Sequence, residues 1–249
     1  MLSKNTVKFI KSLHQKKYRT ESGKFFVEGE KSVLEVLDSD FGVEMIMMTE
    51  SFEEKHFRKL STFYGQKFIL TQNQLEGLGQ FQSNDSALAL VQMKTNQSFK
   101  PEPGEMVLAL DEVRDPGNLG TIIRIADWYG IKKLVFSPQT AEFYNPKVIQ
   151  ATMGSFTRVK FFYEDLGKVF SEWKAPVYGA FLGGDNIHAL EKPAPGVILM
   201  GNESHGISPE ISKYVTQKIT IPAFGHAESL NVAIATAVIC DNFIRLLNR

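Results

Sequence analysis

The fold is decided by Ile221-Pro222-Ala223-Phe224-Gly225-His226-Ala227-Glu228-Ser229-Leu230-Asn231-Val232, a stretch that joins an expected strand to the last expected helix. Pro222 cannot donate to a sheet ladder and therefore ends the strand. Gly225 permits a sharp turn, and Ser229 is placed to cap an apolar helix over 232–247. The free N–H groups and polar side chains at such a helix start can contact a ligand.

Two earlier segments are placed to meet this stretch. One is Asp115-Pro116-Gly117-Asn118-Leu119-Gly120, followed by Arg124, and the other is Gly201-Asn202-Glu203-Ser204-His205-Gly206. Each follows an apolar strand, and ligands of parallel α/β sheets bind at the carboxyl ends of strands. Asn118 is expected to cap the helix that it precedes. The three segments together predict one site at one edge of a sheet.

Arg124 and Glu203 each allow two interpretations when taken alone. Arg124 lies in an apolar run and is either a surface charge or a group that holds an anion. Glu203 is either an exposed loop acid or a carboxylate that orients an arginine or accepts a proton. Spacing by itself does not choose between these alternatives.

The composition is that of a soluble, cytoplasmic protein. Hydrophobic residues make up 43% of the 249 residues, enough for a sizeable core, and 28 basic residues balance 28 acidic ones. Cys240 is the only cysteine, so no intrachain disulfide can form, and its apolar neighbours indicate a core position. Residues 1–15 lack the apolar core of a signal peptide, and no apolar run reaches the length of a membrane span.

The charge is unevenly distributed at the N-terminus. Before residue 25 only Glu21 opposes seven basic residues, which are Lys4, Lys8, Lys11, Lys16, Lys17, Arg19 and Lys24. Such a basic arm can follow the phosphates of a nucleic acid. A solvated helix face would have the same composition, and both interpretations stay open here.

Periodicity divides the chain into two α/β parts. We expect a small domain over 1–94, a linker rich in proline and polar residues over 95–105, and a second domain over 106–249. The expected helices are 6–13, 30–37, 52–60, 72–78, 119–129, 146–153, 166–173 and 232–247. The expected strands are 25–27, 43–48, 67–70, 87–93, 106–113, 133–136, 159–162, 177–182, 197–200 and 218–221. The apolar strands of the second domain predict a mostly parallel sheet covered on both faces.

Several chemistries are not supported by the motifs. The segment 201–208 has the glycine spacing of a phosphate-binding loop. It carries Ile207 at the position of the motif's lysine, which argues against nucleotide hydrolysis. No Gly-x-Gly-x-x-Gly follows a strand, which argues against a dinucleotide-dependent dehydrogenase. The five histidines show no metal-ligand spacing, so no metal is predicted.

Considered together, the three segments resemble the SpoU (TrmH) family of RNA ribose 2′-O-methyltransferases. The resemblance covers roughly residues 106–247, and it includes Asn145-Pro146-Lys147 and Met153-Gly154-Ser155 between the first two segments. Residues 26–31 are similar to the start of the family's small substrate-binding domain. The motifs occur in the family's order and spacing, which makes the match specific.

The resemblance implies the fold, the cofactor and the partners. It implies a mostly parallel sheet with a C-terminal trefoil knot of the SPOUT type, a homodimer, S-adenosylmethionine as cofactor and tRNA or rRNA as substrate. It also implies that the cofactor is contacted by Leu182, Gly201, Ile221 and Leu230. The implied catalytic group consists of Asn118, Arg124, Glu203, Ser229 and Asn231.

The implied chemistry suits these residue types. A 2′-hydroxyl must be aligned with the methyl group and partly deprotonated. An arginine is almost never deprotonated in a protein, so we expect Arg124 to hold the adjacent phosphate and stabilise alkoxide charge, with Glu203 and Asn118 keeping it in place. DNA lacks the 2′-hydroxyl, which makes RNA the substrate. The competing hypothesis is an RNA-binding protein of the same fold that transfers no methyl group.

Overall fold

A computed structural model describes residues 2–247 of the chain. The chain forms two compact units, an N-terminal unit of Met1–Thr95 with Phe143–Thr157 and a C-terminal unit of Asn96–Glu142 with Arg158–Arg249. This grouping differs from the predicted division at residues 143–157, which join the first unit. The reason is packing, because the aromatic rings of Tyr144 and Phe156 lie against Phe25, with centroids 4.6 and 6.0 Å away.

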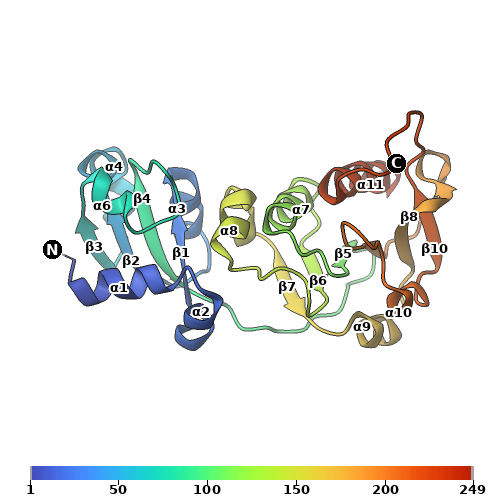
Figure 1. Cartoon of the computed structure of the whole chain (residues 1–249), viewed down its shortest axis with the longest axis horizontal. Coiled ribbons are helices and arrows are strands. Elements are labelled where there is room, and N and C mark those ends of the chain that lie inside the picture. Colours follow the sequence, from blue (N-terminus) through green and yellow to red (C-terminus); the bar gives the residue numbers. More distant parts are fainter. Residues whose placement is uncertain (1, 248–249) are drawn as a thin grey trace. The chain divides into compact units, whose positions relative to one another are not determined.

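The N-terminal unit is built on a mixed four-stranded sheet with the order β1-β4-β2-β3 (Figure 1). The strands are β1 (Lys24–Glu28), β2 (Val43–Met48), β3 (Gln66–Ile69) and β4 (Ala87–Gln92). Strands β1 and β2 run antiparallel to β4, whereas β3 runs parallel to β2. The helices are α1 (Lys4–Ser12), α2 (Lys16–Ser22), α3 (Glu30–Leu37), α4 (Glu50–Lys55), α5 (Phe57–Leu60), α6 (Gln72–Glu76) and α8 (Pro146–Thr152).

Helix α1 shows how sequence pattern becomes packing in this unit. Its apolar side chains recur at helical spacing, so Ile10 and the following Leu13 are fully buried against Met47 and Leu88 of the sheet. The expected helix 52–60 is instead two short helices, α4 and α5. They are separated at His56, whose ring lies against the Phe52 ring in a tilted arrangement and forms a hydrogen bond with Glu30. Helix α2 was not predicted from the sequence.

The C-terminal unit contains six parallel strands in the order β10-β8-β9-β5-β6-β7. The strands are β5 (Val107–Leu110), β6 (Lys133–Phe136), β7 (Lys160–Tyr163), β8 (Val177–Asn186), β9 (Val197–Met200) and β10 (Gln217–Thr220). The helices are α7 (Pro116–Trp128), α9 (Leu166–Trp173), α10 (Pro209–Ser212) and α11 (Val232–Leu247). The predicted parallel sheet is confirmed.

Helices cover both faces of this sheet, as its apolar strands require. Alternate residues of the strands, such as Val107 and Ala109, pack with Val169 of α9 and Ile211 of α10. Helix α11 packs against α7 and β9, and Figure 1 shows α7 and α11 on the opposite side of the sheet from α9 and α10. Among the described residues, no helix is long and apolar enough to cross a membrane.

Strand β8 departs most from its expected form. It was expected to end at Leu182 but continues to Asn186, and its pairing with β10 jumps between Gly179 and Asp185, which face the consecutive residues Lys218 and Ile219. The five residues between them therefore bulge out of the ladder. This bulge lies toward the carboxyl end of β8, where a parallel sheet binds ligands.

Candidate active site

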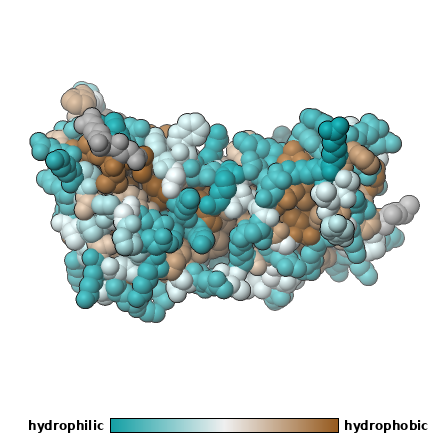
Figure 2. Space-filling model, turned by 180° about the vertical axis from the view of Figure 1, so that it is seen from behind, coloured by the Kyte–Doolittle hydropathy of each residue, from teal (hydrophilic) through white to brown (hydrophobic). Residues whose placement is uncertain are grey.

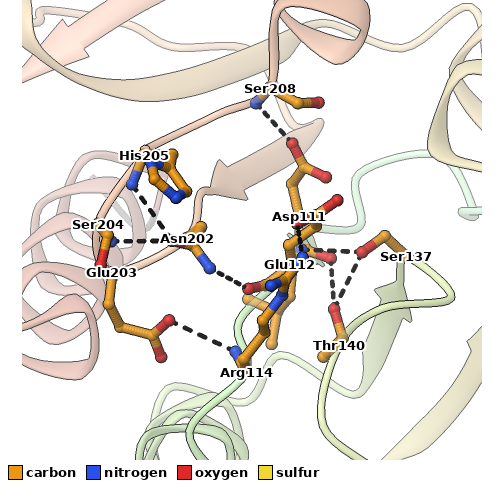
Figure 3. Close-up of polar contacts among 11 residues, drawn as sticks. Asp111, Glu112, Arg114, Ser137, Thr140, Asn202, Glu203, Ser204, His205 and Ser208 are labelled. Atoms are coloured by element: carbon orange, nitrogen blue, oxygen red, sulfur yellow. Dashed lines mark hydrogen bonds and ion pairs between the residues drawn. The ribbon is translucent and has the colours of Figure 1, made fainter.

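The loops that follow β5 and β9 are joined by hydrogen bonds from buried or half-buried side chains (Figure 3). The Asp111 carboxylate is 3% exposed and accepts the Ser208 N–H at 2.8 Å. The Asn202 side-chain amide donates to the carbonyl of Glu112 at 2.7 Å. Because β5 and β9 are neighbouring parallel strands, their carboxyl ends bring these two loops together.

Glu112 occupies an unusual backbone conformation at this junction. Its φ of +57° lies in the left-handed region, which a residue with a Cβ rarely adopts. Its N–H donates to Ser137 Oγ at 2.8 Å, and its carbonyl accepts from Asn202. Its carboxylate forms an ion pair with Arg114 at 2.6 Å. Surrounding partners thus hold a strained residue in place, which is common beside functional sites.

Asn202 organises the second loop. Its side-chain oxygen accepts the N–H groups of Ser204 at 2.8 Å and His205 at 3.2 Å, forming a tight turn. A Cβ on Gly201 would lie 2.2 Å from the backbone of Gly206. Gly201 is therefore required by the close approach of two backbone segments, whatever ligand the site binds.

Glu203 points from this turn to the start of α7. Its carboxylate accepts the backbone N–H of Asp115 at 3.3 Å and that of Arg114 at 3.4 Å. It also accepts the side-chain amide of Asn118 at 3.0 Å. A helix N-terminus carries partial positive charge, so a carboxylate is favoured there. Glu203 therefore contacts the first loop, as the sequence suggested. Its partners there are backbone N–H groups and the Asn118 amide, and not an arginine side chain.

Asn231 completes a chain of three side chains. Its amide donates to Asn118 Oδ1 at 2.9 Å, while the Asn118 amide donates to Glu203. Asn231 Oδ1 also accepts the N–H groups of Ala233 at 2.9 Å and Ile234 at 3.3 Å. Three of the five predicted catalytic residues, which are distant in sequence, are therefore hydrogen-bonded to one another.

Two predicted helix caps are wrong, for one geometric reason. A cap must lie immediately before the first helical residue so that its side chain reaches the N–H groups of the first turn. Asp115, rather than Asn118, fills this position for α7 and accepts the Asn118 N–H at 2.8 Å. Asn231, rather than Ser229, caps α11.

Arg124 and Ser229 do not join this hydrogen-bonded chain. Arg124 is exposed on α7, two turns beyond Asn118, and forms no hydrogen bond or ion pair with any described residue. The expected support of Arg124 by Glu203 and Asn118 is therefore not present, because both of those side chains bond elsewhere. Ser229 is exposed and likewise has no hydrogen-bond partner among residues 2–247.

Of the predicted cofactor residues, two directly follow strands β9 and β10, one lies within β8 and one lies in the loop before α11. Leu182 lies in the β8 bulge and is 79% exposed, and Gly201 follows β9 directly. Ile221 follows β10, and Leu230 is 50% exposed in the loop before α11. The Thr220 hydroxyl donates to the Leu182 carbonyl at 3.2 Å, joining the two strand ends. Exposed apolar side chains at this edge suit an adenosine ring.

The positions of possible metal ligands and of the one cysteine can be described for residues 2–247. No group of three or more His, Cys, Asp or Glu residues that could hold a metal ion occurs among residues 2–247. Burial raises the pKa of the Cys240 thiol to about 12, so this thiol stays protonated at neutral pH. Cys240 is thus a core residue, as its apolar neighbours indicated.

The hydrogen bonds and ion pair of Asn202, Asp111 and Arg114 were not predicted from the sequence. A signal was available for Asn202, because an asparagine between a strand and a Gly-containing segment is typical of a turn that its side chain stabilises. Asp111 falls within the expected strand 106–113, and nothing in its immediate neighbours indicates its hydrogen bond to Ser208, 97 residues away.

Comparison with known proteins identifies related families over both parts of the chain. The SpoU rRNA Methylase family model matches residues 105–241, and the MRM3-like substrate binding domain model matches residues 4–89. The chain is 31% identical to the 23S rRNA (guanosine(2553)-2′-O)-methyltransferase RlmP of Bacillus subtilis, with 94% of this chain and 93% of that protein covered.

Solved structures show the same similarity. A protein from Porphyromonas gingivalis that is assigned to the TrmH family superposes with a TM-score of 0.85 and 34% identity, over 98% of this chain and 99% of that one. An AdoMet-bound rRNA methyltransferase from Sinorhizobium meliloti gives a TM-score of 0.87 and 29% identity, over 98% and 96%. The predicted family is confirmed: this chain belongs to the SpoU rRNA methylase family.

Proposed function

We propose that this protein transfers a methyl group from S-adenosylmethionine to a ribose 2′-hydroxyl of ribosomal or transfer RNA. The observation that carries the proposal is the hydrogen-bonded chain of Asn231, Asn118 and Glu203, which lies at the start of α7. It belongs to the same unit as the strand ends that carry the cofactor candidates. Such an RNA substrate agrees with the cytoplasmic location expected from the sequence.

We assign cofactor binding to Leu182, Gly201, Ile221 and Leu230. The exposed Leu182 and Leu230 side chains offer apolar contact to an adenosine, and the strand ends offer backbone groups that no ladder uses. S-adenosylmethionine, when bound, supplies an activated methyl group on its sulfonium sulfur. Gly201 contributes by keeping the Asn202 turn close to β9.

We assign the handling of the ribose to the polar residues. The hydrogen bonds from Asn118 and from two backbone N–H groups fix Glu203, so this carboxylate and Asn118 form a preorganised wall of the site. The free guanidinium of Arg124 is available to hold the phosphate beside the target ribose and to stabilise charge on the 2′-oxygen. Ser229 has a free hydroxyl in the loop before α11 and donates a further hydrogen bond to the RNA or the cofactor.

The homodimer and the trefoil knot are part of this proposal. Trp128 on α7 and Ile234 on α11 are 83% and 54% exposed, although the two helices pack together. Figure 2 shows hydrophobic surface in the region of α11. Such an apolar face is suited to a second copy of the chain. The pairing of β10 with β8, and the return of the chain to α7 through Asn231, are consistent with the knotted arrangement.

The direct test is transfer of a labelled methyl group from S-adenosylmethionine to total tRNA and, separately, to ribosomal subunits and protein-free rRNA. We expect label on one pool, and nuclease mapping then gives the 2′-O-methylated position. Label on none of them, with cofactor binding demonstrated by calorimetry, would favour the RNA-binding protein without transfer activity.

A further inference from the structure

The N-terminal unit presents lysines of two kinds. Most of those outside α1 and α2 are paired with carboxylates: Lys24 with Glu44 at 2.6 Å, Lys55 with Glu30 at 2.8 Å, Lys94 with Asp40 at 2.5 Å, and Lys59 with Asp38. Hydrogen bonds from Lys55 and His56 lower the pKa of Glu30. The charges of these lysines are therefore balanced within the protein.

The lysines of α1 differ from this set. Lys4, Lys8 and Lys11 are exposed, and none forms an ion pair with a described residue. Their spacing of four and three residues places them on one helix face, along about 10 Å of the axis. Lys16, the first residue of α2, is a further lysine without an ion pair to a described residue. No acidic residue occurs between residues 2 and 20.

This basic face is rigidly supported. Ser3 caps α1 by accepting the Thr6 N–H at 3.1 Å. Arg19, which is 1% exposed, donates to the carbonyls of Leu13 at 2.7 Å and His14 at 3.0 Å and so fixes the corner between α1 and α2. A surface that is already ordered avoids much of the entropy cost of binding. The segment is therefore a fixed helix face, not a flexible arm.

An apolar groove adjoins the lysines. It has a volume of about 500 Å³ and lies between α1 and the β3–α6 segment, with Val7, Lys11, Ile69, Asn73 and Leu78 among its lining residues. Ile69 is 48% exposed there. A groove with apolar walls and an amide suits an unpaired base, and RNA is recognised mostly through such unstacked nucleotides. Lys11 belongs to both features, so a phosphate and its base could be bound side by side.

We propose that the face formed by Lys4, Lys8, Lys11 and Lys16, together with this groove, binds the backbone and an unpaired base of the substrate RNA. The inference rests on the proposed function, because it locates where the small unit holds the RNA that the C-terminal unit methylates. Cations that form no ion pair with the protein's own carboxylates release counterions when they bind phosphates, which gives an affinity that depends on salt.

The test compares two triple variants with the same change of net charge. One carries Lys4→Gln, Lys8→Gln and Lys11→Gln, and the control carries Lys55→Gln, Lys59→Gln and Lys94→Gln. Binding of full-length protein to a fluorescent single-stranded RNA of about 20 nucleotides, and to protein-free rRNA, is measured against salt. The α1 variant should bind roughly tenfold to hundredfold more weakly, and its salt slope should fall by about 2 to 3. The control should retain its slope.

The outcomes separate this inference from the proposed function. The inference would be overturned if both variants lost affinity equally or if the α1 variant lost none. It would also be overturned if duplex RNA competed equally well, or if the face bound phosphatidylserine vesicles in place of RNA. In the transfer assay the α1 variant should raise KM with kcat unchanged. Wild-type methylation with an unchanged KM in the α1 variant overturns only the inference. A wild-type protein that binds RNA through this face but never methylates it overturns only the proposed function.

Folding of the variants is checked independently. Gln and Lys have similar helix propensities, so the thermal midpoint should not change. The single variant Lys8→Glu, at an exposed position, provides a second test and should weaken RNA binding several-fold at low salt. Cofactor affinity should be unchanged in all of these variants.

Discussion

The two sides of the candidate active site differ in how far the fold fixes them. On the polar side, Asn118, Glu203, Asn202 and Glu112 all hydrogen-bond to other parts of the chain. On the cofactor side, residues 221–230 form no hydrogen bond with any other described residue, and most are exposed. The Asn118 and Glu203 side chains are therefore preorganised, whereas Arg124 and the loop 221–230, which includes Ser229, have no such support, and we expect bound ligand to order this loop.

The largest expected effect is that of Arg124→Ala. The assigned role of Arg124 is confined to the RNA phosphate and the 2′-oxygen, so transfer should fall by about a thousandfold or more. Cofactor affinity measured by calorimetry should remain within about twofold, because no cofactor contact is removed. Lys213→Ala, at another exposed cation of the same unit, is the control and should leave both quantities unchanged. Loss of transfer and cofactor binding together would refute this assignment.

Glu203→Gln should have the next largest effect. The amide can still accept hydrogen bonds but brings no charge to the start of α7, so we expect about a hundredfold lower kcat. Stability should change by less than about 1 kcal/mol because the carboxylate is exposed. Glu210→Gln, in the first turn of α10, is the matched control. A normal kcat for the Glu203 variant would show that methyl transfer does not require the Glu203 carboxylate.

Cofactor binding should slow backbone hydrogen exchange on the cofactor side of the site only. Saturation with S-adenosylmethionine or its demethylated product should slow hydrogen exchange by about tenfold or more in 221–230 and in the β8 bulge, since these segments gain contacts to the ligand. Exchange in 111–118 and 202–206 should change little. Equal protection of both sides would contradict the contrast between a preformed and a ligand-ordered half.

The smallest effect is expected at Cys240. Because burial raises the pKa of this thiol to about 12, iodoacetamide at pH 8 should not modify it in the folded protein. Cys240→Ala should retain full transfer activity and lose only about 1 kcal/mol of stability from the small cavity. Rapid labelling of the native protein would show that α11 opens readily.

Much of the fold could be predicted from local pattern. The helices at 30–37, 166–173 and 232–247, and the strands at 43–48, 133–136 and 197–200, lie where apolar periodicity placed them. Local pattern failed where tertiary contacts decide the outcome. Helix 52–60 is interrupted at His56, whose side chain bonds to the distant Glu30, and β8 runs past Leu182, where β10 resumes pairing with it.

By itself, the sequence determined the α/β class, the family and the three segments that form the site, because strand and helix periods and turn residues act over short distances. Only the tertiary structure decided which polar groups meet. The hydrogen bonds from Asn231 to Asn118 span 113 residues and those from Asn118 to Glu203 span 85. Such pairs depend on strand order, which places distant loops at one sheet edge. Tertiary contacts also decided that Arg124 has no partner among the described residues, and that the buried Arg19 fixes the corner between α1 and α2.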